Sequence, residues 1–281
     1  MNRGKLTIGN LLKNRQVTVG GSVLIIFIIL AVLAPYITPY ELWRQDYTAL
    51  LEPPSENHFF GTDQYGRDIF TRILYGGRSS LLAAFGAATL AGFIGIIMGL
   101  IAGYTGGKVD RIIQALINIF WSFPSLLLGL ILVVVLQPGM FSIVIAISLG
   151  YWPQYAQVIR SEVISKRSEE FVEAARAIGA NDIRILFRHI MPNVIAPVIV
   201  LGSLTMGYAI IVEASLSFLG LGIQPPMSSW GTMLSDAREY LGRAPWLSIF
   251  PGVAIALTVV ALNLLGDGLR DILDPHIRNI R

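Results

Sequence analysis

The uncharged stretch SLLAAFGAATLAGFIGIIMGLIAGY, residues 80–104, indicates the kind of fold that this chain adopts. A helix needs about 20 apolar residues to cross the hydrocarbon core of a bilayer, and this stretch is long enough to do so. Its glycines at positions 92, 95, 99 and 103 recur at three- to four-residue spacing, which lets a neighbouring helix pack closely. We therefore expect residues 80–104 to form a transmembrane helix inside a helical bundle.

The composition of the whole chain agrees with that expectation. Its 281 residues are 54% hydrophobic and only 14% charged, whereas a soluble domain carries about 25% charged residues. Further apolar segments long enough to span a bilayer lie at residues 17–38, 112–136, 140–160, 194–216 and 246–269. The sequence thus predicts an all-α polytopic membrane protein with six transmembrane helices. The first is expected to be retained rather than cleaved as a signal peptide, because its apolar run is long and leads into bulky residues.

The positions of the basic residues favour one orientation. The outer segments would hold only Arg44, Arg67, Arg72, Arg78, Arg238 and Arg243 of the 21 lysines and arginines. Because basic residues are retained on the cytoplasmic side, we predict a multi-pass cell-membrane protein with both termini in the cytoplasm. The chain then divides into an N-terminal region, 1–78, with the first helix and an outer amphipathic segment, and a main region, 79–281, with a cytoplasmic loop at 161–192.

Several functions are disfavoured by the residues that the chain lacks. The net charge of +3 follows from basic inner loops and does not indicate nucleic-acid binding. The absence of cysteine excludes disulfides and thiolate chemistry, and the three histidines lie in different loops without metal-ligand spacing. Gly106-Gly107-Lys108 is no phosphate loop, because Ala102 and Val109 stand where that motif needs a glycine and a hydroxyl. We expect no catalytic site, no metal site and no cofactor in this chain.

The inner loop contains the charged stretch EFVEAARAIGANDIRILFRHIMP, residues 170–192. Ser168 can cap a first helix that Gly179 ends, and Asn181 can cap a second that Pro192 ends. Each helix has apolar residues at helical spacing; they are Phe171, Ala174, Ala175 and Ile178 in the first and Ile183, Leu186, Phe187 and Ile190 in the second, with Arg184 and Arg188 on another face. Residues 168–192 should therefore form a compact knob of two helices, which we call the inner knob.

The small side chains of Ala174 and Ala175 would let another protein approach the first helix closely, with Glu173 and Arg176 beside them. The alternative is a solvated amphipathic loop between two spans, which many membrane proteins carry.

The knob resembles a known motif. Glu173-Ala174-Ala175, then Gly179, then Ile190-Met191-Pro192 resemble the EAA loop of permeases from bacterial ABC importers, the segment that docks into a groove of the cytoplasmic ATPase. Residues 60–81, 213–241 and 263–275 are similar to the peptide-type branch, which serves dipeptide, oligopeptide and nickel importers. His189 and Met191 depart from the usual pattern, in which aliphatic residues are common.

The resemblance implies both a fold and a role. The last five helices would form the permease core of a type I (MetI-like) importer, which moves a solute inward from an external binding protein. The partners would be a second, homologous permease and two ATPases, and ATP and Mg would be bound by those ATPases. The residues implied in ATPase coupling are Phe171, Glu173, Ala174, Ala175, Arg176, Ile178, Gly179, Arg184, Arg188 and Pro192.

Two outer segments are long enough to form helices. Asp63 can cap a helix with Ile69, Phe70, Ile73 and Leu74 on one side and an Asp68–Arg72 pair. The second helix would start at Ser228 or Ser229, with Trp230 on its apolar face. It is either a lid on the bundle or, by the resemblance, a dock for the binding protein through Asp236, Arg238, Glu239 and Arg243.

Three questions stay open at the level of the sequence. Glu213 is either part of an outer gate or a structural charge at the membrane interface. Asn118, Trp121, Ser122 and Pro124 could bend their helix and present polar groups to a pathway, although packing is the simpler explanation. Peptides are the substrate that the resemblance favours, over nickel, metal chelates, glutathione or oligosaccharides; a self-contained carrier or channel, or an assembly scaffold, remains the alternative of a different class.

Overall fold

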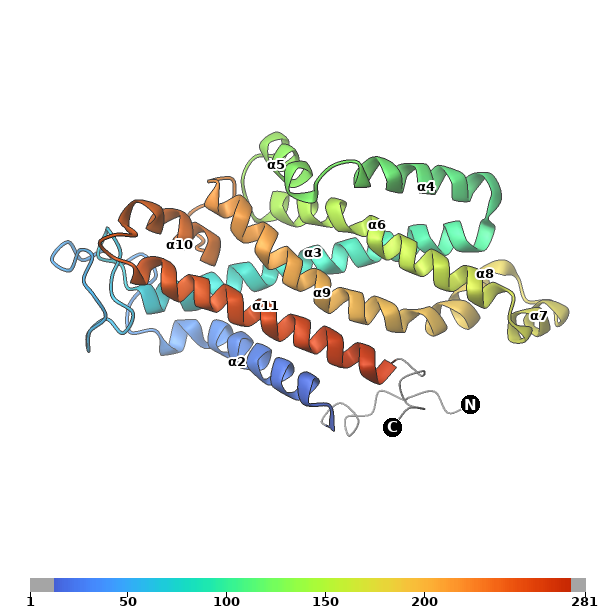
Figure 1. The fold of residues 1–281 in the computed structure, drawn as a ribbon, viewed down its shortest axis with the longest axis horizontal. Coiled ribbons are helices and arrows are strands. Elements are labelled where there is room, and N and C mark those ends of the chain that lie inside the picture. Colours follow the sequence, from blue (N-terminus) through green and yellow to red (C-terminus); the bar gives the residue numbers. More distant parts are fainter. Residues whose placement is uncertain (1–12, 274–281) are drawn as a thin grey trace.

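The computed structural model describes residues 13–273, which form a long bundle of helices (Figure 1). Arg3, Lys5, Arg278 and Arg281, which contributed to the predicted orientation, lie outside these residues. The elements are α2 (Arg15–Ile37), α3 (Ile69–Thr105), α4 (Gly107–Trp121), α5 (Ser125–Leu136), α6 (Met140–Arg167), α7 (Glu170–Ala177), α8 (Asp182–Arg184), the π-helical turn η1 (Ile185–Ile190), α9 (Met191–Phe218), α10 (Trp230–Ala237), the 3-10 turn η2 (Arg238–Tyr240) and α11 (Trp246–Leu273).

The glycine stripe of α3 packs against α6, as the sequence predicts. A Cβ atom added to Gly95 would lie 2.8 Å from the carbonyl oxygen of Trp152, and one on Gly99 would lie 2.6 Å from that of Ala156. These distances leave no room for a side chain, so the glycines allow the two backbones to approach. The α3–α6 pair is therefore the tightly packed axis around which the other helices lie.

The N-terminal helix α2 packs on the last helix, α11 (Figure 1). The side chain of Asn14 caps α2 by accepting hydrogen bonds from the backbone of Gln16 and Val17. A Cβ on Gly20 would lie 2.5 Å from the carbonyl oxygen of Ala261, so these two helices also approach closely. The predicted helix at 17–38 is thus confirmed as a helix within two residues at each end.

The predicted count of six spans is not confirmed. Within residues 13–273, four helical segments are long and apolar enough to cross a membrane, and a fifth is reached only if α4 and α5 count as one broken span. The helix predicted over 112–136 is two helices that meet at 88°, because Pro124 cannot continue a helix through its missing N–H. Helix α6 is long enough to span a membrane. It is not among the four segments, because Gln154, Gln157 and Arg160 in its second half make it more polar than they are.

The first outer helix also differs from the prediction. Asp68, not Asp63, caps α3, since its Oδ2 atom accepts a hydrogen bond of 2.8 Å from the backbone N–H of Thr71. The helix then continues without a break into the membrane-spanning stretch. Asp63 instead closes a turn at Gly66, whose positive φ of 71° suits glycine.

Candidate functional site

The inner knob lies at the end of the bundle where α6 ends and α9 begins (Figure 1). Its first helix, α7, begins after Glu169 rather than Ser168, whose hydroxyl donates to the carbonyl of Ser165. The carboxylate of Glu169 pairs with Lys166 at 2.5 Å. Gly179 follows α7 with a φ of 83°, so the predicted glycine turn is confirmed.

The second helix of the knob begins as predicted and ends differently. The side chain of Asn181 accepts a hydrogen bond of 2.9 Å from the backbone N–H of Arg184 and caps α8. After this turn the chain forms η1 and runs directly into α9, with Pro192 in the first turn of α9. The prediction that Pro192 ends a helix is wrong. A proline is tolerated in the first turn of a helix, where its missing N–H has no partner to lose, and the π turn before it has a different spacing of backbone hydrogen bonds. The knob is therefore continuous with α9.

One face of the knob is buried against the bundle. Val172 and Ala175 of α7 pack with Ile185 and Ile190 of η1, and this cluster extends to Val163 of α6. Of the predicted apolar face of α7, Ala175 is buried and Phe171 is partly buried, while Ala174 and Ile178 are exposed. The buried stripe is shifted by one residue because Val172, not Phe171, points into the bundle. The knob thus rests on α6 and α9 by a continuous apolar contact.

Polar contacts fix the knob to the end of α3. The hydroxyl of Tyr104 donates a hydrogen bond to the carboxylate of Asp182. Arg167, at the end of α6, donates to the carbonyl oxygen of Tyr104 at 2.7 Å, and the guanidinium of Arg176 lies 6.0 Å from the Tyr104 ring. Sequence reasoning did not find Tyr104, because its partners are distant in the chain. The knob, α3 and α6 are tied together at this residue.

The opposite face of the knob presents large apolar side chains without cover from this chain. Ile178 is 85% exposed, Ile183 71% and Phe187 54%. Unlike the exposed apolar residues of the long helices, they lie on short helices beside charged residues. Exposed members of the predicted coupling set lie near them in the sequence, namely Glu173, Ala174, Arg176, Gly179, Arg184, Arg188 and Pro192. Such a patch, apolar with a charged rim, is typical of a protein-binding surface.

At the other end of the molecule, Glu213 is fully buried. Its two carboxylate oxygens accept hydrogen bonds from Ser80 at 3.1 Å and from Ser217 at 2.7 Å. The hydroxyl of Ser80 in turn accepts a bond from the backbone N–H of Trp230 at 3.3 Å. Glu213 thus joins α3, α9 and α10 in the interior of the bundle.

The second outer helix, α10, packs on the bundle. Ser229 caps it as predicted, and Trp230 is only 1% exposed, with its indole N–H donating to the carbonyl of Ile73 at 3.0 Å. Trp230 is thus part of the packing and is not on the surface. Arg238, Glu239 and Arg243 are exposed, so the predicted dock could involve these three.

An ion-pair network connects α10 to the start of α3. The Oδ2 atom of Asp63 accepts from Arg67 at 2.6 Å and from Arg72 at 2.7 Å. Arg72 also bonds Asp236 at 2.9 Å, so the predicted Asp68–Arg72 pair does not form. Burial lowers the pKa of the Arg67 guanidinium, and the neighbouring Arg72 lowers it further, while Asp63 opposes both effects. Each arginine of the network is therefore paired with at least one carboxylate.

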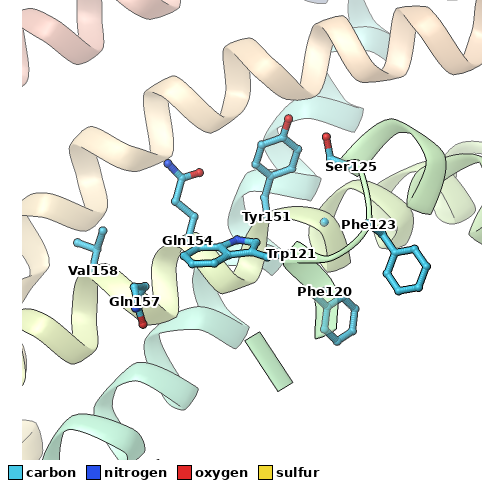
Figure 2. Close-up of a pocket in the computed structure, with 9 residues that line it drawn as sticks. Phe120, Trp121, Phe123, Ser125, Tyr151, Gln154, Gln157 and Val158 are labelled. Carbon is cyan, nitrogen blue, oxygen red and sulfur yellow. The ribbon is translucent and has the colours of Figure 1, made fainter. Parts of the chain in front are cut away.

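A cavity of about 520 Å³ lies between the elbow that joins α4 to α5 and the middle of α6 (Figure 2). Aromatic residues of the elbow, Trp121 among them, form one side, and Tyr151, Gln154 and Gln157 of α6 form the other. Of the residues expected to bend this span and present polar groups, Trp121 lines the cavity; Ser122 and Pro124 lie in the bend.

Sequence comparisons identify similar proteins over almost the whole chain. Residues 95–279 match the family described as binding-protein-dependent transport system inner membrane component, and residues 3–54 match the N-terminal transmembrane domain of oligopeptide transport permease C. The chain is 46% identical to a dipeptide transport system permease protein of Alkalihalophilus pseudofirmus, over 95% of this chain and 88% of that protein. It is 43% identical to a glutathione transport system permease protein of Pectobacterium atrosepticum (95% and 89%), and 41% identical to an oligopeptide transport system permease protein of Bacillus subtilis (94% and 87%).

A comparison of structures gives the same fold. An inward-facing structure of the MetNI methionine ABC transporter has a TM-score of 0.59 with this chain at 20% identity, and the match covers 71% of this chain and 95% of that one. At this identity the likeness concerns the fold alone. It confirms the predicted MetI-like permease architecture.

Proposed function

Because the chain belongs to the family of binding-protein-dependent inner-membrane transport permeases, we propose that it is a membrane subunit of an ATP-driven importer of short peptides. Two of the relatives named above are dipeptide and oligopeptide permeases, and this supports peptides as the solute. Glutathione is the second candidate, supported by the relative of 43% identity.

The observation that carries the proposal is the exposed apolar surface of the inner knob. Ile178 and Ile183 stand on short helices whose other face is anchored to the bundle. Large apolar side chains that fill a pocket on a partner supply much of the binding energy of protein interfaces. The partner in this proposal is a cytoplasmic ATPase, which binds ATP and Mg while this chain binds neither.

The knob would transmit movement by its attachments. Tyr104 ties it to α3, and η1 continues it into α9, so a displacement of the knob moves the cytoplasmic ends of these helices. Two ATPases would drive this chain and a homologous second permease together, and the helix ends would alternately open and close a path. The solute would arrive from a binding protein on the outer face, where Arg238, Glu239 and Arg243 are available for contact.

A charge on Ile178, the most exposed of these apolar side chains, tests the ATPase contact. We expect Ile178→Glu to lower the amount of ATPase that copurifies with the permease at least about tenfold, as for a central interface residue. The control is Leu241→Glu, which places the same charge on an exposed leucine at the outer end of the molecule. Equal recovery of ATPase with both variants would rule out the knob as the dock.

Energy coupling separates an importer from the remaining alternative, a self-contained carrier or channel. Membrane vesicles that contain the complete assembly should take up a peptide only when ATP is supplied on the side of the knob. Uptake at the same rate without ATP would contradict the proposal.

A further inference from the structure

One side of α6 is polar in a part of the bundle where polar groups need partners. Tyr151, Gln154 and Gln157 follow one another at three-residue spacing and all line the cavity. Gln154 lies about halfway along α6, the least apolar of the long helices described. Unpaired amides that face lipid are costly, so this side of α6 must face water, protein or a solute.

The wall opposite α6 is fixed by contacts that run along α4. Arg160 binds both carboxylate oxygens of Asp110, at 2.6 and 2.7 Å. One turn further along, Gln114 donates to the side-chain oxygen of Gln157 at 3.0 Å. The ring of Phe120 then meets Trp152 edge to face at 5.4 Å. These contacts anchor α4 and the start of the elbow to α6, so the space between them is part of the fold.

The polar groups in this space are amides rather than charges. None of the residues that line the cavity carries a formal charge. Within residues 13–273, the side chain of Gln154 has no hydrogen-bond partner, and Gln157 uses its oxygen for Gln114 but keeps its NH₂ group available. A glutamine side chain offers one acceptor and two donor hydrogens, which complement the C=O and N–H of a peptide group.

The remaining surface is suited to side chains of varied shape. Trp121 of the elbow presents a flat apolar ring beside Gln154, whereas the ring of Phe123 points away from the glutamines (Figure 2). Gly150 leaves space on the α6 side, since a Cβ atom there would have Ser125 as its nearest neighbour at 3.7 Å. The volume of about 520 Å³ falls within the range of small-molecule sites, roughly 300–1,000 Å³.

We propose that this cavity is a binding site within the permease for the main chain of a peptide in transit. The amides of Gln154 and Gln157 would pair with a backbone peptide group, and the ring of Trp121 would contact whichever side chain is adjacent. Because the paired groups occur in every peptide, such a site holds peptides without selecting their sequence. This inference rests on the proposed function and adds a site to it.

The probe is the tripeptide alanyl-photoleucyl-alanine, whose diazirine bonds to nearby side chains on illumination. It is supplied to vesicles that contain the complete importer, and the labelled residues are read by mass spectrometry. We expect labels within 120–125 and 150–158, displaced by excess trialanine. Gln154→Leu should lower this labelling about three- to tenfold, which is the range for one lost hydrogen bond. The matched control is Gln16→Leu, the same change on an exposed residue at the start of α2, which should leave labelling unaltered.

A change in the probe tests which group is recognised. Replacing the amide between photoleucine and the C-terminal alanine of the probe by an ester removes one backbone N–H, and the ester should label the unaltered permease less than the amide does. In the Gln154→Leu variant the two probes should label equally, because the partner of that N–H is then absent. An equal loss in both backgrounds would show that Gln154 does not read the main chain and would overturn the proposal.

The same vesicles separate this site from the proposed function. ATP-driven uptake of trialanine with labels only outside the cavity, or with labelling unaffected by Gln154→Leu, would overturn the site and leave the importer standing. Vesicles that take up no trialanine and bind no ATPase at the knob would overturn both. Labelling that excess trialanine does not displace would mean that the probe merely partitions into the membrane, and would also overturn the site.

Discussion

Glu213 illustrates how a single residue can hold distant parts of this protein together. Its carboxylate accepts hydrogen bonds from Ser80 and Ser217, and Ser80 accepts one from Trp230, so three helices meet at this group. Buried polar groups are stabilising only when all their hydrogen bonds are made. The sequence places Glu213 correctly in a helix but does not reveal its burial, because its partner Ser80 lies 133 positions away.

We expect Glu213→Leu to destabilise the outer end of the bundle. The change leaves the hydroxyls of Ser80 and Ser217 buried without an acceptor, which costs about 1–3 kcal/mol for each group left unsatisfied. Thermal unfolding of the purified protein in detergent should therefore show a lower Tm. Glu213→Gln keeps an oxygen acceptor and should lose less, and an equal loss in both variants would contradict the role of the hydrogen bonds.

At the scale of the elements, the α3–α6 pair shows what can be predicted from one sequence. The spacing of Gly95, Gly99 and Gly103 predicts a close helix contact, and the structure confirms it. The same reasoning fails at Pro192 and at Asp63, where the outcome depends on contacts with other elements. Local patterns give most of the helices and the caps Asn181 and Ser229, but they cannot show that η1 continues into α9 or that Asp63 faces two arginines.

A side chain at Gly99 should disrupt the α3–α6 contact. The Cβ of Gly99→Val would lie 2.6 Å from the carbonyl oxygen of Ala156, and overpacking of this kind costs about 1–3 kcal/mol or more. We expect a lower Tm and a smaller yield of folded protein in detergent. The control is Gly21→Ala, because a Cβ there meets nothing within 4 Å; similar losses in both variants would contradict the close-packing argument.

At the scale of the whole molecule, the two ends differ in what they offer to partners. The outer end combines buried pairs such as Asp63 with Arg72 and exposed charges, whereas the inner end presents Ile178, Ile183 and Phe187. The sequence predicts the glycine turn and the Asn181 cap of the inner knob because both are local features, whereas the exposure of Ile178, Ile183 and Phe187 depends on which face of the knob packs on the bundle. It predicts the cavity poorly, because that space exists only where the α4–α5 elbow faces α6.

The central claim is that the inner knob docks on an ATPase, and a crosslink at Ile178 tests it most directly. The chain contains no cysteine, so Ile178→Cys supplies a single attachment point for a benzophenone label in the native membrane. After illumination, mass spectrometry should identify an ATP-hydrolysing subunit joined at this position, and Leu241→Cys at the outer end should not capture it. Label recovered only on lipid or on another copy of this chain would contradict the account.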